Sequence, residues 1–326
     1  MFTFIINPAS RSGLGRQVWE RLEPVLDRRG ISYKAYMTCC QRHATRLARE
    51  LTADGREQTL VVLGGDGTLN EVVNGIQCFS GTTLGYIPVG SGNDFARFFH
   101  FPSDPEEALS LILDCHPSYA DMNIGNLVFR GQEKRFAVSA GLGFDAAICH
   151  QAVISRLKPV LNRLHLGKLT YVLIALDRLH FLRPARVTVT FDDRTSLSFT
   201  DTLFVTAMNH PYEGGGFKFC PGADPCDDRL DVIVVSGISR LKAVLLLLLS
   251  QKAAHTGARG IFIRSCRRVR IESDTSLPVH TDGEPVFLQR RMDASLLQER
   301  LRVIVPRDSA PIPGAPDKTT KERSRT

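Results

Sequence analysis

The sequence contains no long hydrophobic run. Its longest uninterrupted apolar segment covers residues 243–249, whereas a membrane-spanning helix needs roughly 20 residues. The first residues also lack the basic start, the longer apolar stretch and the small-residue cleavage site of a secretory signal. We therefore expect a cytoplasmic protein without a transmembrane segment.

The CxxC spacing is missing as well. The eight cysteines are scattered along 326 residues, and no two of them are separated by two residues. This distribution argues against a disulfide framework and against a common zinc site. With 43% hydrophobic and 23% charged residues, the composition is that of a packed globular protein, and the length predicts one large or two moderate domains.

A basic excess is present. The formal net charge is +7, which favours contact with something anionic: a nucleotide, a nucleic acid or an acidic membrane surface. Charge alone does not choose among these, but no basic patch interleaved with aromatic residues indicates nucleic-acid binding. Residues 307–326 are rich in Pro, Ser and Thr without an apolar period, which predicts a disordered basic tail.

The hydrophobic pattern changes along the chain. Up to about residue 121, short apolar runs alternate with amphipathic stretches of helix length, which is typical of a parallel α/β unit. The predicted strands are 2–6, 33–37, 60–63 and 84–88, and the predicted helices are 16–29, 43–51 and 69–76. Further on, short alternating strands predict a mostly antiparallel domain. These strands are 126–129, 136–140, 185–191, 196–205, 230–235, 268–272 and 303–305, interrupted by helical stretches at 146–182 and 239–256.

The most informative motif is Gly-Gly-Asp-Gly-Thr at residues 64–68. It lies between a predicted buried strand and a predicted helix, where glycines let backbone N–H groups approach an anion without a Cβ in the way. Asp66 and Thr68 add a carboxylate and a hydroxyl, the pairing that can hold hydrated Mg²⁺ and a phosphate oxygen. A phosphate-binding turn is predicted, with a purely structural β-turn as the alternative.

Two further turns repeat this chemistry at neighbouring strand ends. The segment from Pro88 to Asp94 contains two glycines, a hydroxyl and an acid, and Asn7-Pro8 follows the first strand. Because the carboxyl ends of parallel strands meet at one edge of a sheet, we expect the three loops to face one cleft.

Asp282-Gly283-Glu284 places two carboxylates around a glycine, flanked by His280 and Pro285. A carboxylate that accepts a proton from an attacking hydroxyl is one function of such a pair. Asp-Gly is also a strong hairpin signal, so a surface hairpin is the alternative.

Together these motifs resemble the diacylglycerol kinase catalytic superfamily, and within it the soluble bacterial lipid kinases of the YegS/diacylglycerol kinase type. The resemblance extends to about residue 306. The matching positions, in order, are Asn7-Pro8 with Gly13, Thr38 with His43-Ala44, Gly64 to Thr68 with Asn70-Glu71, Gly90 to Asp94, Gly143-Phe-Asp145 and Asp282-Gly-Glu284.

The resemblance implies a nucleotide-binding α/β domain over residues 1–123, with a parallel sheet like that of NAD kinases and phosphofructokinases. It implies a β-sandwich that accepts the lipid over residues 124–306, with the last strands free to return to the first domain. The implied cofactors are ATP and Mg²⁺. The implied nucleotide-binding residues are Asn7, Thr38, Gly64, Gly65, Asp66, Gly67, Thr68, Leu69, Asn70, Gly90, Ser91, Asn93 and Asp94.

The same resemblance assigns the metal and the base. Asp66 and Asp94 would hold Mg²⁺, partly through water, and the Asp282-Gly-Glu284 turn would supply the base, with Glu284 favoured over Asp282. A second, structural Mg²⁺ would be bound by Asp227 and by the carbonyls of Asp224 and Arg229. Here Asp228 replaces the glycine of related sequences, so an empty polar turn is the alternative.

The predicted function is an ATP- and Mg²⁺-dependent lipid kinase that phosphorylates the hydroxyl of a diacylglycerol-like lipid at a membrane surface. Basic amphipathic residues 155–178 and apolar residues 241–249 are the candidate membrane contacts, with core packing as the alternative. A NAD kinase-like phosphotransferase and a non-catalytic nucleotide-binding module are the rival functions. The acceptor lipid is not predicted, and a homodimer is left open.

Overall fold

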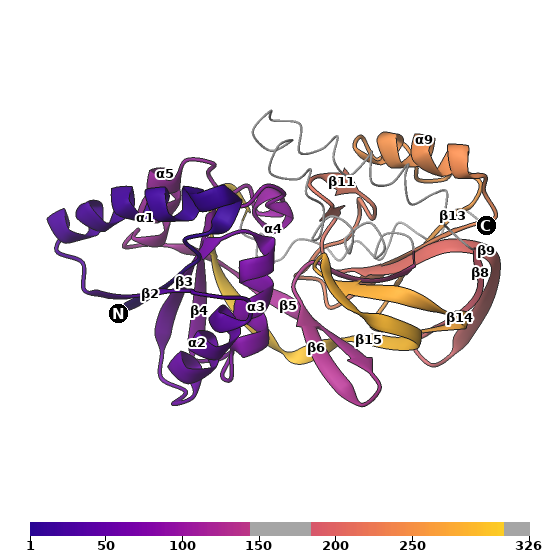
Figure 1. Cartoon of the computed structure of the whole chain (residues 1–326), viewed down its shortest axis with the longest axis horizontal. Helices are drawn as coiled ribbons and strands as arrows, with labels where there is room; N and C mark the ends of the chain where they lie inside the picture. Colours follow the sequence, from indigo (N-terminus) through magenta and orange to yellow (C-terminus); the bar gives the residue numbers. More distant parts are fainter. Residues whose placement is uncertain (144–183, 310–326) are drawn as a thin grey trace.

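The structure is a computed structural model that describes residues 1–143 and 184–309. It consists of an α/β domain and a β-rich domain lying side by side (Figure 1). Four parallel strands in the order β4-β3-β1-β2 form the sheet of the first domain. They are β1 (Phe2–Ile6), β2 (Tyr33–Met37), β3 (Gln58–Gly64) and β4 (Thr82–Pro88). The predicted α/β class is confirmed.

Helices cover both faces of this sheet because its central strands are apolar on both sides. Phe4 and Ile6 of β1 pack with α1 (Ser10–Arg28) and α5 (Pro105–Ile112) on one face. Ile5 packs with α2 (His43–Thr52) and α3 (Asp66–Gly75) on the other. Side chains that alternate along β1 therefore contribute to two separate hydrophobic cores, one on each face of the sheet. Helix α3 begins two residues after the end of β3.

The second domain is built from antiparallel strands, as expected. Strands β7, β9, β8 and β14 pair in a closed ring around an apolar core. Strands β12 and β13 extend the ring beyond β9. The bounds are β7 (Ser139–Gly143), β8 (Ala185–Phe191), β9 (Thr195–Met208), β12 (Leu230–Ser236), β13 (Ile261–Cys266) and β14 (Arg268–Thr281).

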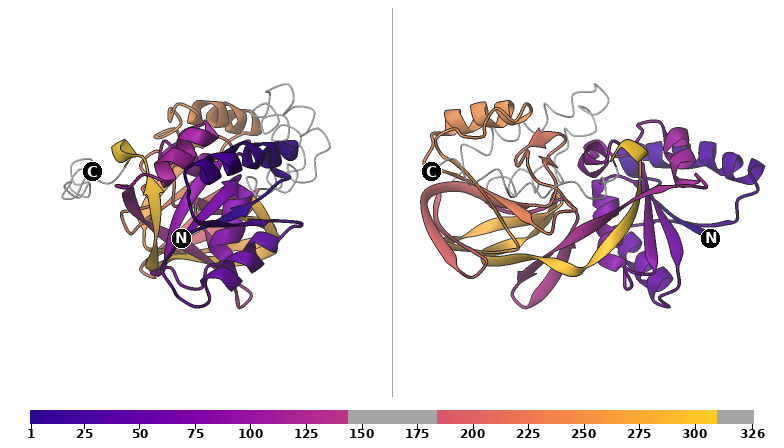
Figure 2. Two further views of the ribbon diagram at one scale, coloured as in Figure 1. Left: turned by 90° about the vertical axis from the view of Figure 1, so that its left-hand side faces the viewer. Right: turned by 180° about the vertical axis from the view of Figure 1, so that it is seen from behind.

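One long strand links the two domains. Strand β15 (Glu284–Val305) leaves the cleft, pairs antiparallel with β14 and with β5 (Ser118–Phe129), and ends beside β4. Arg302 and Val303 pair in parallel with Thr83 and Leu84 of β4. Hydrogen bonding is therefore continuous from the first sheet into the second domain, and Figure 2 shows this strand running between the two.

The single strand predicted at 136–140 is divided in two. Strand β6 (Gln132–Phe136) ends at its first residue, and β7 begins at Ser139, so only residues 137–138 lie outside a strand. The backbone N–H groups of Ala137 and Val138 point to the Asp282 carboxylate, both across 2.8 Å, rather than to a neighbouring strand. A side chain more than 140 positions away therefore interrupts the strand.

The observed helix is shorter than the one predicted over 239–256. Helix α9 spans Arg240–Ser250, and turns lead from it to β13. Ala253 has a φ of 58°, which a continuing helix does not accept.

No helix in the described ranges is both long and apolar enough to span a bilayer. The helix expected at 146–182, the membrane candidate at 155–178, Phe144-Asp145 and tail residues 310–326 lie outside the described residues.

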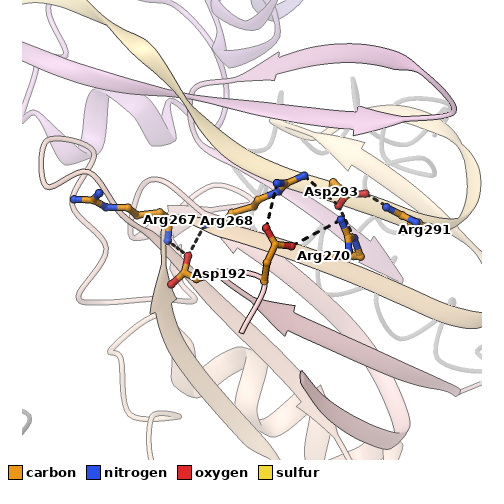
Figure 3. Close-up of polar contacts among 7 residues, drawn as sticks. Asp192, Arg267, Arg268, Arg270, Arg291 and Asp293 are labelled. Carbon is orange, nitrogen blue, oxygen red and sulfur yellow. Dashed lines mark hydrogen bonds and ion pairs between the residues drawn. The ribbon is translucent and has the colours of Figure 1, made fainter. Parts of the chain in front are cut away.

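Ion pairs hold the far end of the second domain together (Figure 3). Asp192 Oδ1, in the turn between β8 and β9, accepts hydrogen bonds from the backbone N–H groups of Arg267 and Arg268 at 2.8 and 3.0 Å. Arg270 and Arg291 both reach the Asp293 carboxylate on β15. These contacts lie at the start of β14, whereas the Asp282 turn follows its other end, so the cluster stabilises the domain without entering the cleft.

Candidate active site

The two glycine turns lie against each other at the carboxyl edge of the parallel sheet. A Cβ on Gly65 would come within 2.9 Å of the Gly90 Cα, and one on Gly90 within 2.7 Å of the Gly65 Cα. The Val89 N–H also donates to the Gly64 carbonyl across 2.8 Å. The turns after β3 and β4 therefore make one continuous backbone surface that only glycine permits at the contact.

The loop after β1 joins this surface. Asn7 Nδ2 donates a 2.9 Å hydrogen bond to Thr68 Oγ1, and Asn7 Oδ1 accepts one from the Ala9 N–H. Thr38 lies one strand further out, at the end of β2, where its N–H donates to the Ile6 carbonyl. Ser91 is exposed on the second turn, and Asn93 Nδ2 donates to the Gly90 carbonyl. These predicted nucleotide-binding residues thus lie along one edge, with Thr38 at its rim, whereas the predicted Leu69 is buried in the core behind it.

Asp66 and Asp94 face each other across the two turns. Asp66 begins α3, and its carboxylate accepts hydrogen bonds from the Asp94 and Phe95 N–H groups at 3.2 and 3.4 Å. Burial, and next the Asp94 charge, raise the pKa of Asp66 to about 7, against the lowering effect of those two N–H groups. Two adjacent carboxylates of which one resists ionisation fit a cation that neutralises both, as Mg²⁺ does.

A loop of the second domain completes the surroundings of Asp94, a contact that the sequence analysis missed. The Gly215 N–H donates a 2.8 Å hydrogen bond to Asp94 Oδ2, and Arg97 Nε lies 3.8 Å from Asp94 Oδ1. Gly215 has a φ of 87° and sits between β10 (Tyr212–Glu213) and β11 (Phe217–Lys218). Three consecutive glycines at 214–216 were the available signal.

The same loop reaches the Asp282-Gly-Glu284 turn through two buried side chains. His280 Nε2 lies 3.2 Å from Glu213 Oε1, and both residues are almost wholly buried. His280 Nδ1 accepts a 3.2 Å hydrogen bond from the Gly283 N–H. Since Nδ1 accepts, the proton of a neutral ring lies on Nε2, the atom that faces Glu213 Oε1. The loop that holds Asp94 and the turn that carries Glu284 are therefore connected.

Asp282 is fully used by hydrogen bonds. Its Oδ2 accepts from Asn70 Nδ2 and the Ala137 N–H at 2.7 and 2.8 Å, and its Oδ1 accepts from the Val138 and Ser139 N–H groups at 2.8 and 2.9 Å. Four donors occupy the acceptor positions around its two oxygens, so the carboxylate is not free to turn toward a substrate hydroxyl. This arrangement favours a structural role for Asp282 and leaves Glu284 as the candidate base.

Glu284 lies against the first glycine turn. A Cβ on Gly67 would come within 2.8 Å of Glu284 Oε1, so the carboxylate occupies the space that the missing side chain leaves. Thr281 pairs with Glu284 around Asp282 and Gly283, which have φ angles of 50° and 77°. The segment is thus a hairpin turn, but it lies against the first glycine turn of the other domain instead of on an open surface.

Lys134 of β6 is a second residue that the sequence analysis missed. Burial lowers the pKa of Lys134, and the charge of Glu284, followed by that of Asp282, opposes this shift. The charges of Lys134 and of the candidate base therefore attract each other. A lysine in a short amphipathic strand carries no distinguishing signal, so only the fold shows this interaction.

Glu71 has a local role. Its two carboxylate oxygens accept hydrogen bonds from the Arg42 and Ala44 N–H groups at 2.8 and 3.2 Å. Both N–H groups lie at the amino end of α2, where a helix offers no acceptor of its own. Arg42, the residue before the helix, takes a φ of 65°. An acid at this place caps the helix and ties the loop after β2 to α3.

In the acidic turn at 224–229, Asp228 takes the left-handed backbone conformation that glycine favours. Asp228 has a φ of 62°, and Asn123 and Arg300 hold its carboxylate at 2.8 and 2.6 Å. Asp227 Oδ1 accepts the Arg229 N–H at 3.0 Å, and burial and the Asp224 charge raise the pKa of Asp227 to about 6. Across residues 1–143 and 184–309, no group of three or more His, Cys, Asp or Glu side chains is arranged to hold a metal, so a cation at either site needs carbonyl, water or phosphate ligands as well.

Comparison with known proteins agrees with this architecture. The profile of the diacylglycerol kinase catalytic domain matches residues 1–123, and that of the YegS C-terminal NAD kinase beta sandwich-like domain matches residues 138–304. The chain is 31% identical over 290 residues to YtlR of Bacillus subtilis, a candidate lipid kinase, covering 86% of this chain and 92% of that protein. It is 26% identical over 311 residues to a diacylglycerol kinase of Staphylococcus epidermidis, covering 93% and 92%.

Solved structures share the fold. A diacylglycerol kinase from Bacillus anthracis superimposes with a TM-score of 0.68 at 21% identity, covering 95% of this chain and 98% of that one. A NAD kinase from Archaeoglobus fulgidus in complex with ATP gives a TM-score of 0.53 at 10% identity, with 95% of each chain covered. By its sequence profiles and relatives, the chain belongs to the diacylglycerol kinase-like family of lipid kinases.

Proposed function

We propose that this protein is an ATP-dependent lipid kinase that transfers the γ-phosphoryl group to the hydroxyl of a diacylglycerol-like lipid. The observation that carries the proposal is the position of Glu284, whose carboxylate the second domain brings against Gly67 in the first glycine turn. A base next to a phosphate-binding turn is the arrangement that phosphoryl transfer to an alcohol requires.

The glycine turns would bind the nucleotide phosphates through backbone N–H groups, as the amino end of α3 favours negative charge. Asp66 and Asp94 would hold Mg²⁺. The ion would supply charge neutralisation for the phosphate groups. The NAD kinase from Archaeoglobus fulgidus, which shares the fold at 10% identity, was solved in complex with ATP. We propose the same nucleotide for this chain.

Glu284 would accept the proton of the lipid hydroxyl as it attacks. Lys134 favours the ionised carboxylate by its positive charge. The Asn70–Asp282 contact and the His280–Gly283 hydrogen bond hold the turn from both sides, so the carboxylate does not need to reorganise when the substrate enters.

Helix α9 would meet the membrane that carries the substrate. Its exposed leucines follow one stripe, at Leu241, Leu245, Leu248 and Leu249, with exposed fractions from 37 to 82%. No acidic residue occurs between positions 236 and 259. The opposite side of α9 covers an apolar cavity lined by Phe204, Phe219, Ile233, Leu246, His255 and Ile261, among others. The basic residues of this segment are Arg240, Lys242, Lys252 and Arg259. An apolar stripe in a basic segment suits an anionic bilayer surface.

The test is incubation of the purified protein with radiolabelled ATP, Mg²⁺ and a mixed lipid extract, with NAD offered in a parallel reaction. A labelled lipid phosphate that Glu284→Gln no longer makes is the expected result. Label on NAD instead would establish the NAD kinase-like alternative. Nucleotide binding without transfer to any acceptor would establish a regulatory module.

A further inference from the structure

Two adjacent cysteines at the rim of the cleft carry chemistry that the proposed kinase reaction does not use. Cys39 and Cys40 lie two and three residues after the end of β2, and both are exposed. Cys39 Sγ lies 3.1 Å from His43 Nδ1 and 3.6 Å from Cys40 Sγ. We propose that this group is a thiol–disulfide exchange site, in which Cys39 attacks a low-molecular-weight disulfide and Cys40 resolves the product.

His43 is placed to act as the base. The backbone N–H of Cys39 donates to His43 Nδ1 across 3.0 Å, so Nδ1 directs its lone pair toward Cys39 and carries no proton in the neutral ring. The Cys39 thiol lies within reach of the same atom. An imidazole at this distance can accept the thiol proton as the sulfur attacks, which is the role of a base beside a nucleophilic cysteine.

The surroundings hold this geometry in place. His43 is the first residue of α2, and Glu71 binds the N–H groups on either side of it, at Arg42 and Ala44. The Thr38 N–H is tied to the Ile6 carbonyl at 2.8 Å. The loop is therefore fixed at both ends, so the contact between thiol and imidazole belongs to a defined conformation.

The two cysteines have different roles. A hydrogen bond with Cys39 raises the pKa of the Cys40 thiol. Cys39 Sγ lies within reach of His43 Nδ1, which makes Cys39 the attacking thiol, and Cys40 Sγ lies 3.6 Å from Cys39 Sγ, which places it to resolve the mixed disulfide. An attacking thiol with a neighbouring resolving thiol is the arrangement found where disulfides are exchanged rather than stored.

The exchange balances in two steps. In the first, the Cys39 thiolate attacks one sulfur of the disulfide R–S–S–R, a bond forms between Cys39 Sγ and that sulfur, and R–S⁻ leaves and takes a proton. In the second, the Cys40 thiolate attacks Cys39 Sγ, the Cys39–Cys40 bond forms, and the second R–S⁻ leaves. Two protein thiols are oxidised and one disulfide is reduced to two thiols.

The test uses the fully reduced, full-length protein with oxidised glutathione at pH 7.5, and follows each cysteine by peptide mass spectrometry. Cys115 is exposed and serves as the internal control. We expect Cys39 to react at least about tenfold faster than Cys115, because the imidazole 3.1 Å away can accept the thiol proton during the attack. His43→Gln should remove most of this difference while leaving the reactivity of Cys115 unchanged.

Two serine variants separate the steps. Cys40→Ser should stop at a stable glutathione adduct on Cys39, whereas the unaltered protein passes on to the Cys39–Cys40 disulfide. Cys39→Ser should reduce the reactivity of this loop to that of Cys115. Equal rates at Cys39 and Cys115, or no accumulation of the adduct in the Cys40→Ser protein, would overturn the proposal. None of these readouts depends on kinase activity, so they stand apart from the function proposed above.

Discussion

The Asn70 side-chain amide donates a 2.7 Å hydrogen bond to Asp282 Oδ2, across a sequence separation of 212 positions. Asn70 lies three residues after Gly67 on α3, and Asp282 lies two residues before Glu284. The contact therefore sets the candidate base against the glycine turn, although the two come from different domains. A hydrogen bond to a charged group, largely shielded from water, is strong enough to hold such an alignment.

Replacing this carboxylate should cost stability. Asp282→Asn puts an amide NH₂ group in front of two N–H donors, at Asn70 and Ala137, so both lose their acceptor. We expect the free energy of unfolding in urea to fall by about 2–3 kcal/mol. Glu284→Gln, on the same turn, should keep its stability and lose turnover. A stable and inactive Asp282→Asn protein would instead make Asp282 the base.

The stability of the nucleotide-free protein should depend on pH through Asp66. Its pKa of about 7 in the folded state lies above that of an ordinary carboxyl, so the folded state binds the extra proton and its stabilisation is lost as pH rises from about 4 to 7. The slope is at most about 1.4 kcal/mol per pH unit. Asp66→Asn should flatten the curve measured by urea unfolding between pH 5 and pH 8. An unchanged slope would show that Asp66 is already ionised.

Lys134 should affect the pH dependence of the reaction. Lys134→Met removes a positive charge that interacts with Glu284, so the acidic limb of the pH–rate profile should move to higher pH. Lys134→Arg keeps the charge and should leave that limb in place. Steady-state rates between pH 5 and pH 9 provide the measurement. If the methionine variant lowers turnover equally at every pH, the lysine contributes only packing.

The acidic turn at 224–229 can be tested for a cation in the Asp66→Asn protein, which removes the carboxylate of the other candidate site. Saturating Mg²⁺ should raise the melting temperature of this protein, because binding at about 100 times Kd adds about 2.7 kcal/mol. The further change Asp227→Asn should abolish the increase. If Mg²⁺ acts equally on both proteins, or on neither, the turn holds no cation.

The leucine stripe of α9 should contribute to membrane binding. Leu241→Glu together with Leu245→Glu should weaken sedimentation with anionic vesicles by at least about tenfold, since each leucine transferred out of water contributes about 1.5–3 kcal/mol. Leu288→Glu is the matched control, because Leu288 on β15 is as exposed as Leu245, at 54%. Equal vesicle binding by all variants would assign the stripe to a protein contact or to solvent.

Local pattern alone predicted much of this protein. The apolar runs of β1, β3 and β4 and the glycines that follow them depend on neighbouring residues, so the α/β class and the edge that carries the turns could be read directly. The Asp-Gly pair at 282–283 likewise predicted its own hairpin. Each of these properties is decided within a few residues of chain.

Only the tertiary structure decided which groups in the cleft do what. Spacing does not show that Asp282 is held by four donors, that these donors break the strand predicted at 136–140, or that Gly215 reaches Asp94 from 121 positions away. The electrostatic interaction between Lys134 and Glu284 likewise arises only from packing. The accessibility and charge of a carboxylate depend on the partners and the burial that packing creates, and residues far apart in the chain supply both.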